Sequence, residues 1–162
     1  MQKNTSEKGK FKEKIHSALY KSDEIKELLL DNIETDKMDN SEIRVNFKKH
    51  VKSHLFIDDT IQETSSFIFY DIILPFIKPN IKTCKILLYA ICHRDILDNY
   101  YKDGYFGNRA DILTQMIENV LINDKKIVNE FGIGELSLDS VDIYNSNRFY
   151  GYIMTFSVPN FR

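Results

Sequence analysis

Apolar side chains in the N-terminal region recur at the spacing of an amphipathic helix. They stand three or four positions apart, at Phe11, Ile15, Ala18 and Leu19 and again at Ile25, Leu28 and Leu29. Ser22 separates the two runs and is followed by two acidic residues, which is typical of a helix N-cap. We therefore predict one broken helix or two consecutive helices, preceded by a flexible tail over residues 1–10.

The next segment, from Asn32 to Glu42, is polar and predicts a loop, at the end of which Ser41 can cap a helix. Apolar residues then recur every four positions, at Ile43, Phe47, Val51 and Leu55. This spacing favours a helix, while Val45 leaves a short strand as the alternative. The same stretch, from Arg44 to His54, is the most basic in the chain, and we interpret its charges as the solvated side of that helix.

After residue 59 the pattern changes to that of strands. Two runs, "SFIFYDIIL" (66–74) and "CKILLYAICH" (84–93), are rich in β-branched and aromatic residues, and "PFIKPNIKT" with its two prolines separates them. The second run is apolar in both phases of the two-residue period of a strand. It therefore predicts a central strand that is covered on each face.

A second helix is predicted after the loop that spans Arg94 to Gly107. Asn108 is a candidate N-cap with Asp111 three positions later, and a clear amphipathic run follows. The last third predicts two strands, "GELSLDSVDIY" (134–144) and "FYGYIMTFSV" (149–158). Because Leu138 and Val141 stand in opposite phases, we expect a bulge near Asp139 that keeps both on the core side.

These elements predict an α+β fold in one domain over residues 1–162. We expect a mixed or antiparallel sheet of about four strands, with the N-terminal helices and one central amphipathic helix packed on it. The length of 162 residues and the content of 43% hydrophobic and 28% charged residues agree with a single globular domain.

Charge and hydropathy narrow the classes of partner. With 22 basic against 24 acidic residues, the net charge of −2 gives no electrostatic basis for direct nucleic-acid recognition. No apolar run reaches the roughly 18 residues that a membrane span needs, and the N-terminus lacks the apolar core of a signal peptide. We expect a protein that is made and kept in a cytosol, or assembled from it, with no membrane partner. Cys84 and Cys92 lie too far apart on one strand to bridge, so we expect buried free thiols.

The segment "CHRD", beginning at Cys92, is the densest chemical cluster in the chain. Cys92 and His93 are neighbours on a strand and point to opposite faces, which disfavours a shared metal ion or a thiol activated by that imidazole. His50 and His54 would share a helix face but lack a third ligand and the glutamate of a zinc hydrolase. We predict no catalytic residue, no metal site and no cofactor. A small metal- or thiol-dependent enzyme using Cys92, His93 and Asp95 remains the rival hypothesis.

The loop after that strand contains the aromatic stretch "NYYKDGYF" (99–106), here called the aromatic loop. Its tyrosines either cover the edge of the core or form an interface with another protein, and the pattern favours neither. For the second case we take as candidate assembly-interface residues Arg94, Asp95, Asp98, Tyr100, Tyr101, Tyr105, Phe106 and Arg109.

The order of these elements, and the segments "TSSFIFYDIILPFI", "CKILLYAICHRDIL", "GNRADILTQMI", "FGIGELSL" and "RFYGYIMTFSVPNF", resemble a protein family. It is the neck or tail-terminator (tail-completion) proteins of tailed bacteriophages and of phage-tail-like bacteriocins from low-GC Gram-positive bacteria. The resemblance covers roughly residues 58–161, and the N-terminal region matches less well.

The resemblance implies a non-enzymatic structural protein that works in virion assembly, including assembly from a prophage. In that family the subunits form a ring, commonly a homo-hexamer, that terminates the tail tube or joins it to the head or collar. The expected partners are other copies of the chain, the tail tube protein, and possibly sheath and head–tail connector proteins. The expected location is the neck of a virion or phage-tail-like particle. Another neck adaptor or a head-completion protein is the alternative within this class.

Overall fold

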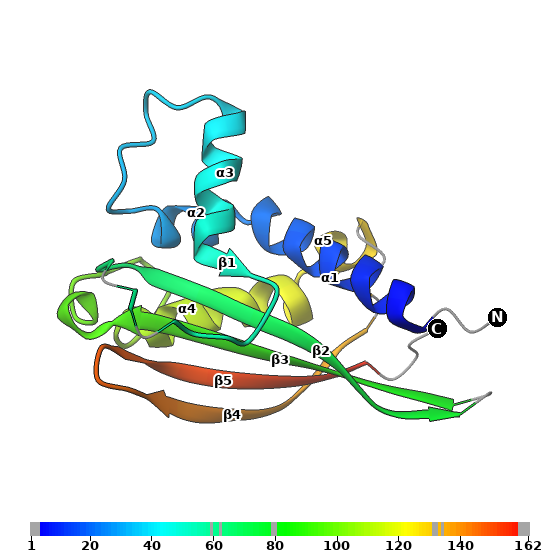
Figure 1. The fold of residues 1–162 in the computed structure, drawn as a ribbon. Helices are drawn as coiled ribbons and strands as arrows, with labels where there is room; N and C mark the ends of the chain where they lie inside the picture. The colour runs from blue at the N-terminus through cyan, green and yellow to red at the C-terminus, as the bar shows by residue number, and fades with distance from the viewer. Residues whose placement is uncertain are drawn as a thin grey trace.

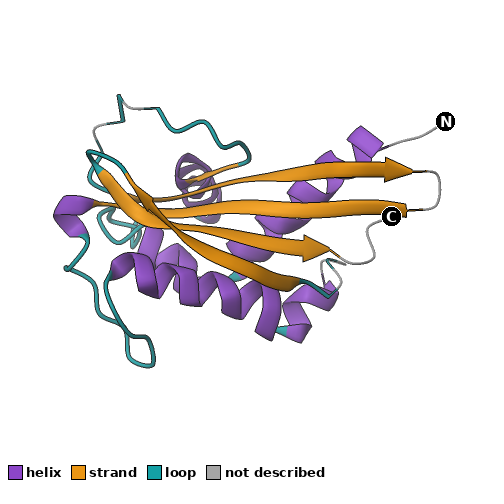
Figure 2. Ribbon diagram, turned by 90° about the horizontal axis from the view of Figure 1, so that it is seen from below, coloured by secondary structure: helices purple, strands orange, loops and turns teal. Residues whose placement is uncertain are grey.

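The computed structural model describes residues 4–58, 60–61, 63–78, 81–130, 133 and 135–158. A five-stranded mixed sheet carries the helices on one of its faces (Figures 1 and 2). The strands are β1 (Val51–Lys52), β2 (Ser66–Lys78), β3 (Ile81–His93), β4 (Ser137–Asn145) and β5 (Phe149–Val158). The helices are α1 (Asn4–Lys21), α2 (Asp23–Leu29), α3 (Asn40–His50), α4 (Arg109–Glu118) and α5 (Lys125–Glu130), with a 3-10 helix (Arg94–Ile96) and a π-helical turn (Asn119–Asn123). The predicted α+β class is confirmed, with one strand more than expected.

The N-terminal region forms two consecutive helices. The chain breaks at Ser22, whose Oγ accepts a hydrogen bond from the backbone N–H of Ile25 at 3.2 Å and so caps α2. Residues 4–10 belong to α1, where we predicted a flexible tail. Lys8 and Lys12 approach the carboxylate of Asp71 on β2 at 3.5 and 2.8 Å, and these contacts hold the polar start of α1 beside the sheet.

For the segment after the first loop, the helical alternative holds. The cap of α3 is Asp39 and not Ser41, because the Asp39 carboxylate accepts from the N–H of Glu42 at 2.8 Å. The helix ends at His50, and Val51 leaves the four-residue pattern to pair with Ile68 in parallel. We did not predict this short strand, because its pairing depends on a partner from outside its own sequence pattern.

Strands β2 and β3 form an antiparallel hairpin that is longer than predicted. Both continue into the segment 75–83, where we expected a separating loop. The register shifts between Ile73 and Phe76, around Pro75, which has no N–H to give to a ladder. The described pairing of β3 with β5 stops at Cys84, so the tip of the hairpin projects beyond the rest of the sheet (Figure 2).

The order across the sheet is β1-β2-β3-β5-β4, which makes β4 one edge. The predicted bulge lies between Leu138 and Ser140. It leaves Leu138 opposite Phe156 and Val141 opposite Met154, so both apolar side chains point to the side of the helices. Gly151 sits where β5 meets β3 most closely, and a Cβ there would lie 2.0 Å from the carbonyl oxygen of Ala90.

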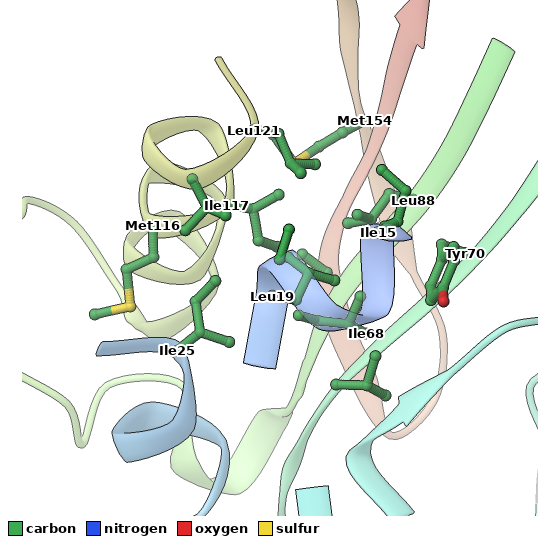
Figure 3. Close-up of a cluster of buried hydrophobic side chains, with 14 of the residues drawn as sticks. Ile15, Leu19, Ile25, Ile68, Tyr70, Leu88, Met116, Ile117, Leu121 and Met154 are labelled. Atoms are coloured by element: carbon green, nitrogen blue, oxygen red, sulfur yellow. The ribbon is translucent and has the colours of Figure 1, made fainter. Parts of the chain in front are cut away.

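The main core lies between the sheet and the helices (Figure 3). Side chains from α1, α2, α4 and the sheet meet there, including Ile15, Leu19, Ile25, Ile68, Leu88, Met116, Ile117 and Met154. The capping box predicted for α4 is present, with Asn108 and Asp111 each accepting from the other's backbone N–H. Our prediction of a central strand covered on both faces was only partly right: Ile91 is buried on the second face, whereas Leu87 and Tyr89 are half-buried.

Candidate assembly surfaces

The sheet face opposite the helices carries a second, smaller apolar cluster, formed by Phe67, Phe69, Ile91 and Phe149. The connection from β1 to β2 crosses this end of the face and places Ile57 and Ile61 on the cluster. The guanidinium of Arg148 donates to the carbonyl of Ile61 at 3.0 Å and fastens the connection there. The rest of the face is only half-buried, so its apolar side chains are available for contact.

The free edge of the sheet, β4, exposes apolar side chains between acidic ones. Val141 is 49% exposed and Ile143 is 67% exposed, although both point to the helix side. Asp139 and Asp142 are exposed on the same strand, and no other described residue forms an ion pair with either of them. We call Asp139, Val141, Asp142 and Ile143 the β4 edge. An exposed edge strand with apolar side chains is a common site of association between chains.

A groove of about 700 Å³ lies at the other edge of the sheet, between α1, α3 and β1. Its charged lining consists of Lys12, Arg44, Lys48 and Lys52 against one carboxylate, that of Glu13. We call it the basic groove. Burial, Lys48 and Arg44 lower the pKa of His16, whose imidazole also lines the groove. Among the described residues, the Nε2 atom of His16 has no hydrogen-bond partner although it is buried.

Arg109 does not lie on the surface, where our candidate interface placed it. Its side chain is 3% exposed, and its guanidinium reaches the carbonyl of Ile96 at 3.0 Å and the Asp31 carboxylate at 2.9 Å. It also reaches the carbonyl of Leu28 at 3.5 Å and stacks over Tyr100 with 4.9 Å between the guanidinium carbon and the ring centre. Arg109 therefore fastens the aromatic loop to α2 and α4 from within.

The remaining candidates divide into tethered and exposed side chains. The Tyr105 hydroxyl donates to the carboxylate of Glu24 on α2, which holds that side of the aromatic loop against the helices. Tyr101 and Phe106 are 82% and 78% exposed. The first sequence alternative holds for Tyr100 and Tyr105, which cover the core edge, whereas Tyr101 and Phe106 face solvent. The second alternative, an interface with another protein, stays a prediction.

The charged candidates lie where β3 leaves the sheet. Arg94, Asp95 and Asp98 are exposed. The guanidinium of Arg94 donates to the side-chain oxygen of Asn145, and its backbone N–H donates to the carbonyl of Arg148 at 2.8 Å. These contacts bring the start of the loop to the turn between β4 and β5. The start of the loop and the C-terminal end of β4 consequently lie side by side, although they are far apart in the chain.

The geometry of Cys92, His93 and Asp95 gives the thiol no base. Cys92 is fully buried on the helix side, where burial raises its pKa to about 12. His93 points to the other face and packs edge-on against Phe149, with 5.6 Å between ring centres. Its Nδ1 accepts from the backbone N–H of Asp95 at 3.1 Å. As expected from their adjacency on a strand, thiol and imidazole do not meet.

His50 and His54 do not share a helix face, because α3 ends at His50. His50 is buried, with its Nδ1 3.0 Å from the carbonyl oxygen of Ser66 and its ring stacked on Phe67, whereas His54 is exposed in the following loop. Arg44, Lys48 and Lys49 are exposed on α3, as we interpreted, but the buried His50 and the strand that begins at Val51 correct our assignment of the whole segment to the solvated side of a helix. In the described part of the chain, no three His, Cys, Asp or Glu side chains gather as metal ligands, and no helix is long and apolar enough to cross a bilayer.

Comparison with protein families gives one match. The model of the YomW family matches residues 13–158. The chain belongs to the YomW family. This is a Bacillus phage-region family, and its name points to an association with prophages. Searches of the curated proteins and of the solved structures find no match.

The YomW match extends from α1 to the end of β5, so it contains the β4 edge and all of the basic groove after Lys12. Our sequence reasoning did not identify either surface. The basic residues of 44–54 were visible as a charge cluster, but the groove also needs α1, which packs beside α3 only in the fold. Val141 and Ile143 were visible as core-phase residues, and only the extent of the helical layer leaves them exposed.

Proposed function

We propose that this YomW-family protein is a structural neck protein of a phage or phage-like tail. It forms a ring that terminates the tail tube, or joins the tube to the head or collar, and it acts through contact between proteins and not through catalysis. The observation that carries the proposal is the pair of exposed apolar surfaces, the β4 edge and the tip of the aromatic loop, in a prophage-associated family.

The fold supports this proposal physically. Tyr101 and Phe106 are large apolar or amphipathic side chains on a loop that Arg109 and Tyr105 hold in place, so binding to a partner costs little ordering of the loop. Aromatic side chains of this kind are enriched where protein interfaces gain most of their affinity. The β4 edge offers a second exposed surface, on the strand whose C-terminal end meets the start of this loop.

The partners that follow are further copies of this chain and the tail tube protein, with sheath or head–tail connector proteins beyond them. The protein would be made in the bacterial cytoplasm and would remain in the virion or the phage-tail-like particle. A ring of six subunits is the arrangement implied by the resemblance to tail terminators.

Electron microscopy with negative stain tests the proposal directly. The purified protein, alone and mixed with tail tubes from the same prophage, should form rings and bind to one end of the tubes. A protein that stays monomeric and ignores tube ends would contradict the proposal. Binding at the head side of a connector, with no binding to tubes, would instead identify a head-completion or adaptor protein.

A double variant and its control test whether Tyr101 and Phe106, here called the aromatic tip, are needed for tube binding and not for folding. Tyr101→Ala with Phe106→Ala should abolish tube binding, because both side chains face solvent and their loss removes contact area only in the assembly. The matched control is Phe56→Ala, since Phe56 is 72% exposed in the connection between β1 and β2. The thermal melting curve should be unchanged in both. Equal loss of tube binding in the control would show that the effect does not belong to the aromatic tip.

A further inference from the structure

The geometry points to the contact that joins one subunit to the next: the β4 edge of one copy docks into the basic groove of its neighbour. This inference rests on the proposed function, because it names the surfaces by which the ring would close. The occupant of the groove is thus a second copy of this chain. Charge, side-chain character and position in the sheet each support that assignment.

Charge is the first support. The basic groove presents Lys48 and Lys52 beside Arg44, and the β4 edge presents Asp139 and Asp142 without a basic partner among the described residues. Lys12 is the exception in the groove, because its ammonium is already bound to Asp71 at 2.8 Å. A positive surface and a negative surface on a chain of net charge −2 attract each other between copies, and repel their own kind.

The character of the side chains is the second support. Val141 and Ile143 alternate with the acidic residues and need an apolar surface to cover them. Val51 and Tyr70 form the floor of the groove but are only 4% and 1% exposed, so the aliphatic stems of Lys48 and Lys52 on its rim would supply most of that apolar surface. An apolar centre with a charged rim is the usual composition of a protein interface.

Position in the sheet is the third support. The basic groove lies at the β1 and β2 edge and β4 is the opposite edge (Figure 1), so one copy cannot satisfy its own groove. Val141 and Ile143 point to the helix side, where the groove lies between two helices and β1, whereas Asp142 between them points to the other face of β4. We therefore infer that β4 enters the groove edge-on, so that side chains of both its faces contact the groove. A contact between two different surfaces of identical subunits repeats head to tail, and it closes into a ring when the rotation permits.

The backbone of β2 shows why the groove, and not the bare edge of β2, takes the neighbour. The carboxylate of Asp71 accepts from the N–H of Ile72 at 2.7 Å and binds Lys12, which covers this part of the edge. Covered and charged edges resist addition of a strand. Docking therefore occurs by side chains in the groove beside it.

Charge reversal provides the decisive experiment. Lys48→Glu in the groove and Asp142→Lys on the β4 edge should each weaken ring formation by roughly tenfold or more, because each places like charges in contact. A one-to-one mixture of the two variants should regain assembly as rings in which the variants alternate, and the double variant should assemble alone, because in both cases every contact regains opposite charges. The matched controls are Lys126→Glu on α5 and Asp36→Lys in the loop before α3, both exposed and outside the two surfaces. Assembly is measured by sedimentation velocity at low and high salt, with circular dichroism to verify folding.

Site-directed cross-linking gives an independent readout. Burial raises the pKa of Cys84 to about 11 and that of Cys92 to about 12, so both native thiols react slowly with maleimides. A bifunctional maleimide should then join Ile143→Cys of one copy to Lys48→Cys of another. A chain that carries both substitutions should give a ladder up to the closed ring, and Lys126→Cys paired with Ile143→Cys should give none.

The outcomes separate this inference from the proposed function. Rings that form normally with Lys48→Glu and Asp142→Lys and do not cross-link between positions 143 and 48 overturn the inference and leave the proposed function in place. Failure of the unmodified protein to form rings, alone or on tube ends, overturns both. Rescue in the double variant together with the ladder establishes the contact.

Discussion

Arg109 shows at the scale of one residue how the chain holds its aromatic loop. Its guanidinium joins α2 through Asp31 and Leu28, the 3-10 helix through Ile96, and the loop through Tyr100. Asn108 before it and Asp111 after it cap the same helix. A planar group with several donors suits a position where acceptors converge from three directions.

Arg109→Ala should therefore lower the free energy of unfolding by about 3 kcal/mol, since it removes one member of a largely buried ion pair and leaves several acceptors unpaired. Arg109→Lys should recover only part of this loss, because an ammonium cannot reach the same set of acceptors. Urea unfolding at pH 7 measures both. A loss below 1 kcal/mol in the alanine variant, the size of an ordinary surface change, would show that the guanidinium does not hold the loop.

Gly151 should be irreplaceable where Gly9 is not. A Cβ at Gly151 would meet the backbone of Ala90 at 2.0 Å, and backbone at the centre of a sheet cannot move aside. Gly151→Ala should cost about 3 kcal/mol or more. Gly9 lies inside α1 with nothing within 4 Å of its missing Cβ, so Gly9→Ala should instead stabilise by about 0.5–1 kcal/mol. Thermal and urea unfolding should therefore show opposite changes in stability for the two variants. Similar changes in both would contradict a role for the close approach between Gly151 and Ala90.

At the scale of elements, the spacing of apolar residues predicted most of the helices and strands. The period predicted α1, α2, α4, β3 and β5, because each has its pattern written in its own residues, and the capping box of α4 was visible for the same reason. Two of the features that the period did not predict share one cause. The strand β1 exists only through pairing with Ile68, and the exposure of Val141 depends on where the helical layer ends. Neither is encoded within its own segment.

The apolar side chains of the β4 edge should be needed for ring formation and not for the stability of the monomer. Val141→Thr with Ile143→Thr keeps the β-branched shape of both residues and removes apolar surface from the exposed edge. The stability of the monomer should change by no more than about 0.5 kcal/mol per site, as for other surface positions. Ring formation should fall, because the same side chains lose apolar contact with the neighbour's groove. Sedimentation velocity and thermal melting measure the two effects, and unaltered rings would contradict a role for the β4 edge.

At the scale of the whole molecule, the sequence predicted the fold class more completely than the surfaces. Local patterns indicated a sheet with helices on it, and they also showed that Cys92 and His93 face apart. The candidate interface was right about the exposure of Tyr101 and Phe106 but not of Arg109. A basic residue at the start of a helix that follows a polar loop looks solvated until the distant acceptors, Leu28 at the end of α2 and Asp31 just after it, are in place. The basic groove is likewise a product of two helices that are separated in the chain.

Buried histidines should make the stability of the molecule depend on pH. Burial lowers the pKa of His50 below 6.5, although its hydrogen bond with the carbonyl of Ser66 acts in the opposite direction. Burial, followed by Lys48 and Arg44, lowers the pKa of His16 as well. The unfolded chain then binds more protons than the folded protein once the pH falls through 6.5. The free energy of unfolding should therefore decrease as the pH falls from about 7.5 to 5.5, before the carboxylates begin to titrate.

His50→Gln tests which residue causes this decrease. An amide at this position can still donate to the carbonyl of Ser66 but does not titrate, so the decrease between pH 7.5 and 5.5 should become smaller, and His16 should supply what remains. The readout is the slope of stability with pH from urea unfolding at several pH values, which stays informative even if the variant is less stable throughout. The matched control is His54→Gln, which makes the same substitution at an exposed imidazole. An unchanged slope in His50→Gln would show that the buried imidazole is not the group whose protonation opposes folding.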